Sequence, residues 1–158
     1  MKTISRAAIL LALFPLAATA APVAPDPVAP VHQFLDGFNA GDTKTAYAAF
    51  VTGTIAITDE FPPYNWVSPK APQIWAGDYD KNAAAVGVSD GHVSYGAAAV
   101  VNVKGPNAYV TLPTVYTYKS HGKPTSEEAT MAYALTLTKA GWKIRAWTWS
   151  GTVPHPAK

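Results

Sequence analysis

The chain has 158 residues, with twelve basic side chains, ten acidic side chains and no cysteine. Without cysteine it has neither disulfide bonds nor a lipid-modified amino-terminal cysteine, so its stability must come from an ordinary hydrophobic core. The lysines and arginines form no cluster, which argues against nucleic acid as a partner because nucleic-acid-binding surfaces concentrate positive charge.

Residues 1–20 have the features of a cleaved signal peptide. Lys2 and Arg6 give a charged start, a mostly apolar run follows, and the segment ends in the small-x-small sequence ATA. A membrane anchor would need roughly 20 apolar residues, whereas this run is shorter and contains Pro15. We expect cleavage after Ala20 and a mature protein that is periplasmic or secreted, formally neutral and without a membrane span.

Two helices are predicted after the leader. Residues 21–30 alternate proline with small residues, which favours an extended linker. Apolar side chains then recur at helical spacing over residues 31–38, and Gly41 suits the end of that helix. Asp42 suits the N-cap of a second helix, which the sequence TKTAYAAF supplies over residues 43–50.

A short strand and a third helix are predicted next. The sequence TIAIT alternates β-branched residues with alanine and delivers Asp59 and Glu60 to the end of a strand. The Pro62-Pro63 pair stops that strand. Residues 71–86 predict a helix, although Gly77 weakens its first half.

The rest of the chain predicts strands. The sequence GVSDG that begins at Gly87 predicts a turn, and strands are then expected over residues 92–103, 108–119, 130–139 and 142–150, separated by the turn sequences KGPN, SHGKPTSEE and KAG. Helices followed by strands predict an α+β fold with a mostly antiparallel sheet. The domain is expected to span residues 31–151, leaving residues 152–158 as a tail.

The last predicted strand carries apolar residues on both faces. Alternation puts Trp147 and Trp149 on one face and Ile144 and Ala146 on the other. One face must pack against helices, and the other needs a partner subunit or a curved sheet to cover it.

The order of elements, together with FLDGFNAGDTKTAYAAF, TDEFPP, a third helix that carries tryptophan and the closing GWKIRAWTWSG, resembles the nuclear transport factor 2-like superfamily. The resemblance includes SnoaL-like and ketosteroid-isomerase-like members and extends from about residue 31 to residue 151. It implies N-terminal helices packed in a strongly curved sheet, a cystatin-like cone with an apolar pocket at its open end. Enzymes, ligand binders and interaction domains share this fold, so it does not fix a function.

The resemblance places Asp59 where ketosteroid-isomerase-like members have the carboxylate that removes a proton next to a carbonyl. Nearby aromatic residues would desolvate Asp59 and raise its pKa, as a general base requires. The alternative is that Asp59 and Glu60 are solvated acids at a strand end. Those members also use a first-helix tyrosine and a late-strand protonated acid as oxyanion donors. Here Phe34 takes the tyrosine's position and residues 130–137 contain no acid.

Aromatic residues are the stronger indication of a binding site. The four histidines are scattered without metal-binding spacing, so neither a metal nor a cofactor is expected. Tryptophan and tyrosine offer large apolar areas with a polar handle, which suits a pocket for a small apolar or aromatic molecule. The residues predicted to contact it, each with core packing as the alternative, are Phe34, Phe38, Trp66, Trp75, Tyr79, Tyr116, Tyr133 and Trp147.

Three hypotheses for function follow. The leading hypothesis is an exported, cofactor-free protein that binds a small molecule. The second is an isomerase, cyclase or lyase with Asp59 as general base, for which Tyr116 or Tyr133 would have to replace the missing oxyanion donors. The third is a homodimeric interaction module that uses the two-sided apolar sheet.

Overall fold

The computed structural model describes residues 25–157, within which the chain forms two helices, a pair of short strands, a third helix and then the remaining strands. The predicted signal peptide, its cleavage site and the first residues of the predicted linker lie outside the described residues. Between residues 25 and 157, no helix is long and apolar enough to cross a membrane.

The first two helices meet at a short turn. The helix α1 (Ala29–Asn39) has a proline in its first turn, where the N–H that proline lacks is not needed. Gly41 follows with a φ of 68°, a left-handed conformation that glycine adopts without strain. The Asp42 carboxylate accepts a hydrogen bond of 3.0 Å from the Thr45 backbone N–H and caps α2 (Thr43–Tyr47). The predicted end of the first helix and the predicted N-cap of the second are confirmed, but α2 ends at Tyr47, before its predicted end at residue 50.

The helices α1 and α2 pack unusually closely at Gly37. A Cβ atom added to Gly37 would lie 2.7 Å from the backbone nitrogen of Ala46 and 3.0 Å from its Cα atom. Real Cβ atoms do not approach backbone so closely, so only glycine fits this contact. Gly37 therefore fixes how α2 sits against α1.

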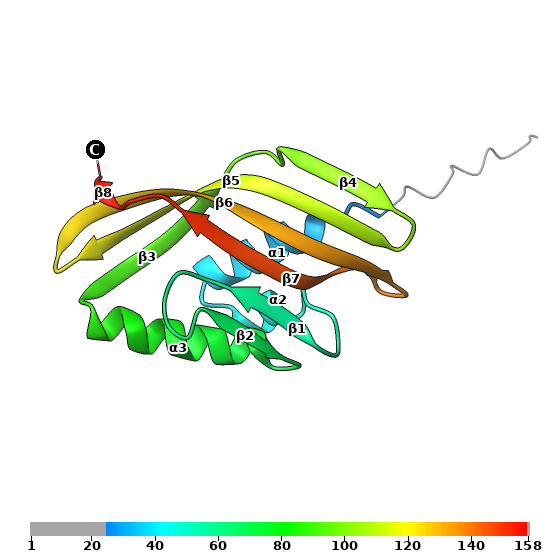
Figure 1. The fold of residues 1–158 in the computed structure, drawn as a ribbon, viewed down its shortest axis with the longest axis horizontal. Helices are drawn as coiled ribbons and strands as arrows, with labels where there is room; N and C mark the ends of the chain where they lie inside the picture. Colours follow the sequence, from blue (N-terminus) through cyan, green and yellow to red (C-terminus); the bar gives the residue numbers. More distant parts are fainter. Residues whose placement is uncertain (1–24, 158) are drawn as a thin grey trace, which may run out of the picture.

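The third helix, α3 (Ala71–Ala85), confirms the predicted helix and continues through Gly77. The helix contacts β1 (Ile55–Thr58) and β2 (Asn65–Ser68) as well as β3 (Val88–Tyr95). These strands lie at opposite ends of the sheet, so the sheet must curl to bring both ends to one helix. Figure 1 shows α3 beside β2 and β3, below the long strands.

The sheet is mixed but mostly antiparallel. Its main strand order is β2-β1-β7-β6-β5-β3, with β4 paired to β5 and β8 paired to β6. The pair β1–β7 is parallel, and the other paired strands are antiparallel. The α+β fold with a strongly curved, mostly antiparallel sheet is therefore confirmed. The remaining strands are β4 (Val100–Lys104), β5 (Asn107–Ser120), β6 (Lys123–Thr138), β7 (Gly141–Gly151) and β8 (His155–Pro156).

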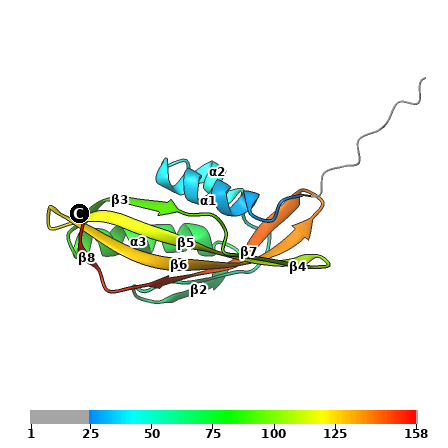
Figure 2. The ribbon, with the colours of Figure 1, turned by 90° about the horizontal axis from the view of Figure 1, so that it is seen from above.

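The main core lies between the sheet and the helices. Figure 2 shows α1 and α2 stacked on one face of the long strands. Burial of apolar side chains between these layers is the main source of stability. The large side chains that are almost fully buried there include Phe34, Leu35, Ile57, Leu112, Tyr133, Leu135 and Ile144.

The strand boundaries differ from the predictions in five places. The run over residues 92–103 is two strands, because β3 and β4 pair with different halves of β5 and the chain bends between them against Pro113. The predicted turn at residues 87–91 lies mostly within β3, as a register shift in that strand. The strand β2 was not predicted. The strand β8 lies in the predicted tail at residues 152–158 and pairs with β6.

The fifth difference is the turn between β5 and β6. The sequence SHGKPTSEE predicts a long turn, but the turn is made by His121 and Gly122, with φ values of 49° and 78°. Two consecutive residues with positive φ form the tight connection that suits a twisted hairpin. The strand β6 consequently starts at Lys123, seven residues before its predicted start at Thr130, and includes Glu127.

A bulge at Arg145 changes which residues of β7 share a face. Consecutive residues of β6 lie opposite Ala146 and Ile144, so Arg145 is the extra residue of a β-bulge. Ile144 is 0% exposed and Trp147 is 4% exposed, and both belong to the core. The prediction that Ile144 faces away from Trp147 is wrong. The interaction-module hypothesis required Ile144 and Trp147 to lie on opposite faces of the last strand, and both instead belong to the same core.

Candidate ligand-binding site

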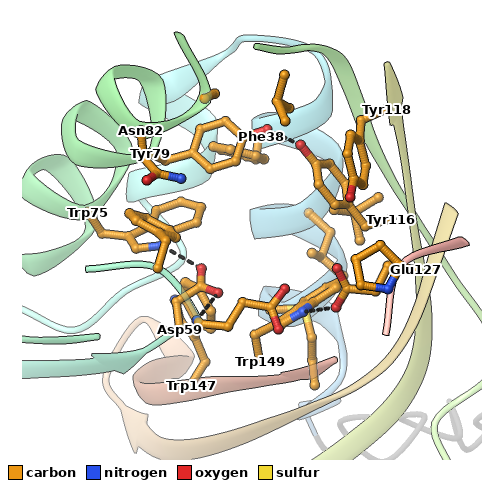
Figure 3. A pocket seen from close by; sticks show the side chains of 18 of the residues that line it. Phe38, Asp59, Trp75, Tyr79, Asn82, Tyr116, Tyr118, Glu127, Trp147 and Trp149 are labelled. Carbon is orange, nitrogen blue, oxygen red and sulfur yellow. Dashed lines mark hydrogen bonds between the residues drawn. The ribbon is translucent and has the colours of Figure 1, made fainter. Parts of the chain in front are cut away.

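A cavity of about 430 Å³ lies between α1, α3 and the curved sheet. Its volume falls within the roughly 300–1,000 Å³ that is typical of small-molecule sites. Figure 3 shows its side chains arranged as a ring around an open centre, with tryptophan and tyrosine rings on several sides. The three carboxylates that line the cavity, those of Asp59, Glu60 and Glu127, come from two segments far apart in the sequence.

The segment TDEFPPYNW brings two of these carboxylates to the cavity. It forms the turn between β1 and β2, where the Asp59 backbone N–H donates to the carbonyl of Tyr64 at 3.1 Å. Phe61 is 9% exposed and packs on Trp66 with ring centres 5.0 Å apart. The buried Phe61 ring anchors the turn, and Asp59 and Glu60 are thereby held against the cavity.

The Asp59 carboxylate is held by two N–H donors. Its Oδ2 atom accepts from Nε1 of Trp75 at 2.8 Å, and its Oδ1 atom accepts from the Glu60 backbone N–H at 2.8 Å. Burial raises the pKa of Asp59, while these two hydrogen bonds act against that rise. Asp59 is therefore an oriented, partly desolvated carboxylate, which is what a general base requires.

Glu60 and Glu127 form a carboxyl pair next to Asp59. Burial, followed by a hydrogen bond to Glu127 and the negative charge of Glu127, raises the pKa of Glu60 to about 7. Oε1 of Glu127 also accepts from Nε1 of Trp149 at 3.0 Å. A Cβ atom on Gly151 would lie 1.6 Å from Oε1 of Glu127 and 2.7 Å from Oε2 of Glu60, so glycine leaves the room that the pair occupies.

The pKa of Glu60 predicts that the protein loses stability as the pH rises from about 4.5 to about 7. Its folded value of about 7 lies above the ordinary value of 4.5, so the folded protein holds this proton more tightly than the unfolded chain does. The resulting stabilisation is complete below pH 4.5 and is lost as the pH rises through 7. Asp59, whose pKa is also raised, acts in the same direction.

Urea denaturation of the Glu60→Gln variant at several pH values measures this contribution. We expect the free energy of unfolding of E60Q to fall less between pH 4.5 and pH 7 than that of the unchanged protein. Asp80→Asn is the control, because Asp80 is exposed and does not line the cavity. If the free energy of unfolding fell equally in E60Q and in the unchanged protein between pH 4.5 and pH 7, the raised pKa of Glu60 would be contradicted.

Three phenol groups complete the polar part of the wall. The hydroxyl groups of Tyr79 and Tyr116 share a short hydrogen bond, and Tyr118 stacks on Tyr116 with ring centres 4.6 Å apart. Burial is the largest cause that raises the pKa of each of the three phenols, so all remain neutral at ordinary pH. Within residues 25–157, the cavity lining includes no lysine, arginine or histidine. The charged groups in the wall are thus all carboxylates.

Seven of the nine predicted site residues line the cavity: Phe34, Phe38, Asp59, Trp75, Tyr79, Tyr116 and Trp147. Trp66 does not, because it packs behind Phe61 and its Nε1 atom donates to Oδ2 of Asp78 at 3.0 Å. Tyr133 does not either. It is fully buried, and its hydroxyl donates to the sulfur of Met131 at 3.1 Å. Tyr133 is therefore not available as an oxyanion donor in the cavity, whereas Tyr116 lies in its wall.

Glu127 is the most important site residue that was not predicted. It lies directly opposite Tyr116 in the pairing of β5 with β6, which puts both side chains on the cavity side of the sheet. The sequence contains one indication of this pairing, the dipeptide His121-Gly122. A two-residue turn at this dipeptide places Glu127 opposite Tyr116. The statement that residues 130–137 contain no acid is correct, but the strand that supplies the acid begins earlier.

The described residues contain no group of three or more His, Asp or Glu side chains arranged to hold a metal ion. The three carboxylates in the cavity instead accept hydrogen bonds from indole and backbone N–H groups, or share one with each other.

Comparison with known proteins identifies the fold. No family model matches the chain, and no curated protein matches its sequence. Among solved structures, a ketosteroid isomerase-like protein from Erwinia carotovora atroseptica is 16% identical with a TM-score of 0.62, over 80% of this chain and 94% of that one. A nuclear transport factor 2-like superfamily protein from Salmonella enterica is 16% identical with a TM-score of 0.63, over 83% and 89%.

A third structure, a candidate scytalone dehydratase from Novosphingobium aromaticivorans, is 10% identical with a TM-score of 0.61, over 82% of this chain and 84% of that chain. At these identities the similarity concerns the fold, which is known from both enzymes and binding proteins. The curled sheet around α1 and α3, the cavity at its open side and these structural matches agree. The chain therefore has the fold of the nuclear transport factor 2-like superfamily.

Proposed function

We propose that this protein is an exported, cofactor-free protein that binds a small, largely apolar or aromatic molecule. The observation that carries the proposal is the cavity of about 430 Å³ with aromatic walls and a carboxylate cluster at one side. Aromatic side chains that face water in such a cavity are stabilised when an apolar ligand covers them. A ligand that stacks on Trp75 and Trp149 would provide this cover.

Native mass spectrometry of residues 21–158, purified from an exporting host, tests ligand binding directly. A discrete additional mass that is released on denaturation is the expected result, and its identity gives the ligand class. The mass of the bare chain also tests cleavage after Ala20. A bare protein that gains no mass from any of a broad set of aromatic and apolar compounds would count against ligand binding.

A second function, acid–base catalysis, is supported by the pairing of two kinds of carboxyl group in one cavity. Asp59 is an oriented carboxylate, while Glu60, with a pKa of about 7, carries a proton about half of the time at neutral pH. A base and a proton donor on the same cavity suit the removal of a proton next to a carbonyl and its return elsewhere. An isomerase or lyase could therefore operate with Asp59 as base and Glu60 as acid.

Replacing Asp59 with asparagine is expected to abolish such turnover and leave the fold intact. The loss should be on the order of 10²–10⁴-fold, which is the usual contribution of a general base. Exchange of α-protons for deuterium, followed by NMR over a set of cyclic ketones, measures proton removal without knowledge of the product. Asp80→Asn serves as the control, since Asp80 is exposed and does not line this cavity. Unchanged exchange in Asp59→Asn would remove Asp59 from the mechanism.

A homodimer remains a prediction. Equilibrium sedimentation of residues 21–158 measures it, and a strict monomer would argue against an interaction module.

A further inference from the structure

We propose that the ligand of this cavity is a small organic cation, an arylalkylamine whose aliphatic amino group is positively charged at neutral pH. This inference rests on the proposed ligand-binding function and specifies its ligand. It begins with the charge of the cavity wall, where Asp59, Glu60 and Glu127 have no basic side chain among the described lining residues to balance them.

The hydrogen bonds to these carboxylates orient them but do not neutralise them. Nε1 of Trp75 donates to Asp59 and Nε1 of Trp149 donates to Glu127, and both donors are uncharged. A desolvated carboxylate is costly unless a positive charge compensates for it. Glu127 is 2% exposed, so this cost is not removed by water. A cation bound in the cavity would provide the missing charge.

The aromatic rings of the wall suit the same kind of ligand. The face of an aromatic ring attracts a cation, and tryptophan and tyrosine do so most strongly. The rings around the open centre in Figure 3 include those of Trp75, Tyr79, Tyr116 and Trp149. The phenols stay neutral, so they add ring faces and hydroxyl groups without adding negative charge.

Binding of a cation should be coupled to the release of a proton. The ionisable groups that face the cavity are Asp59, Glu60 and Glu127, together with the neutral phenols of Tyr79, Tyr116 and Tyr118. Burial, together with a hydrogen bond to Glu127 and the negative charge of Glu127, raises the pKa of Glu60 to about 7. A cation favours its ionised form, so affinity should rise as the pH rises through 7 and then level off.

Titration calorimetry with two probes of nearly equal shape tests the proposal on residues 21–158. The cationic probe is benzyltrimethylammonium, and the neutral probe is neopentylbenzene, in which a carbon atom replaces the nitrogen. We expect the cation to bind roughly tenfold or more tightly than the neutral probe, about the effect of a desolvated cation–π contact. Cation binding should release a proton near pH 7, seen as a dependence of the measured heat on the buffer.

The variant Glu60→Gln tests whether ionisation of Glu60 is coupled to cation binding. It should remove the pH dependence of cation binding, while Asp80→Asn, which changes an exposed residue outside the cavity lining, should bind the cation as the unchanged protein does. Equal or tighter binding of neopentylbenzene, without proton release, would overturn the cation proposal and leave the proposed binding function standing. Failure of both probes to bind would count against both proposals.

Discussion

Replacing Tyr133 with alanine should lower the free energy of unfolding by about 3–5 kcal/mol, the usual cost of truncating a fully buried aromatic side chain. Tyr133 is 0% exposed and belongs to the core cluster, so alanine would leave a void that the packed neighbours fill only in part. Urea denaturation followed by tryptophan fluorescence measures the change. A loss below about 1 kcal/mol would show that the site collapses around alanine.

The matched variant Tyr133→Phe tests whether the hydroxyl matters. The hydroxyl donates only to the sulfur of Met131, which is a weak acceptor. Removing a buried hydroxyl that has so poor a partner is expected to change stability by less than about 1 kcal/mol in either direction. Ligand binding should not change in Y133F, because Tyr133 does not line the cavity. A large loss of ligand binding in Y133F would show that Tyr133 contributes to the binding site.

Replacing Gly37 with alanine is the second large expected effect. The new Cβ atom would fall 2.7 Å from the backbone nitrogen of Ala46, and backbone cannot move aside as a side chain can. Overpacking of this kind costs about 1–3 kcal/mol, which exceeds the gain of about 1 kcal/mol that alanine brings to a helix interior. We expect a lower denaturation midpoint, measured by circular dichroism.

Gly77→Ala provides a control of the opposite sign. Gly77 also lies inside a helix, but a Cβ atom there would meet nothing within 4 Å. Only the helix propensity then changes, and alanine should stabilise the protein by about 0.5–1 kcal/mol. If Gly37→Ala proved as stabilising as Gly77→Ala, the close contact between α1 and α2 would be wrong.

The helices could be predicted from the sequence because their signals are local. Apolar spacing, the glycine at position 41 and the cap at Asp42 act within a few residues, and the structure uses them as predicted. Strand order, by contrast, depends on pairing between distant segments. The parallel pairing of β1 with β7 leaves no mark in either segment alone.

The candidate site was predicted only in part for a related reason. An aromatic residue gives the same signal whether it packs in the core or faces a cavity, so Trp66 and Tyr133 could not be separated from Trp75 and Tyr116. Glu127 was not predicted as a site residue, because the turn before β6 was predicted to be too long and Glu127 fell inside it. Arg145 shows a third limit, because a bulge shifts the alternation of buried residues and only the pairing register reveals it.

The parallel pairing of β1 with β7 has a consequence for how the chain reaches its folded state. The strand β7 lies between β1 and β6, so the hairpin of β1 and β2 can join the sheet only after the last long strand is present. Contacts between segments so far apart in the sequence slow folding, since a long loop must close before they form. A growing chain that lacks residues 141–151 would thus keep this hairpin separate from the rest of the sheet. We expect truncation before residue 141 to abolish cooperative unfolding rather than merely lower the midpoint.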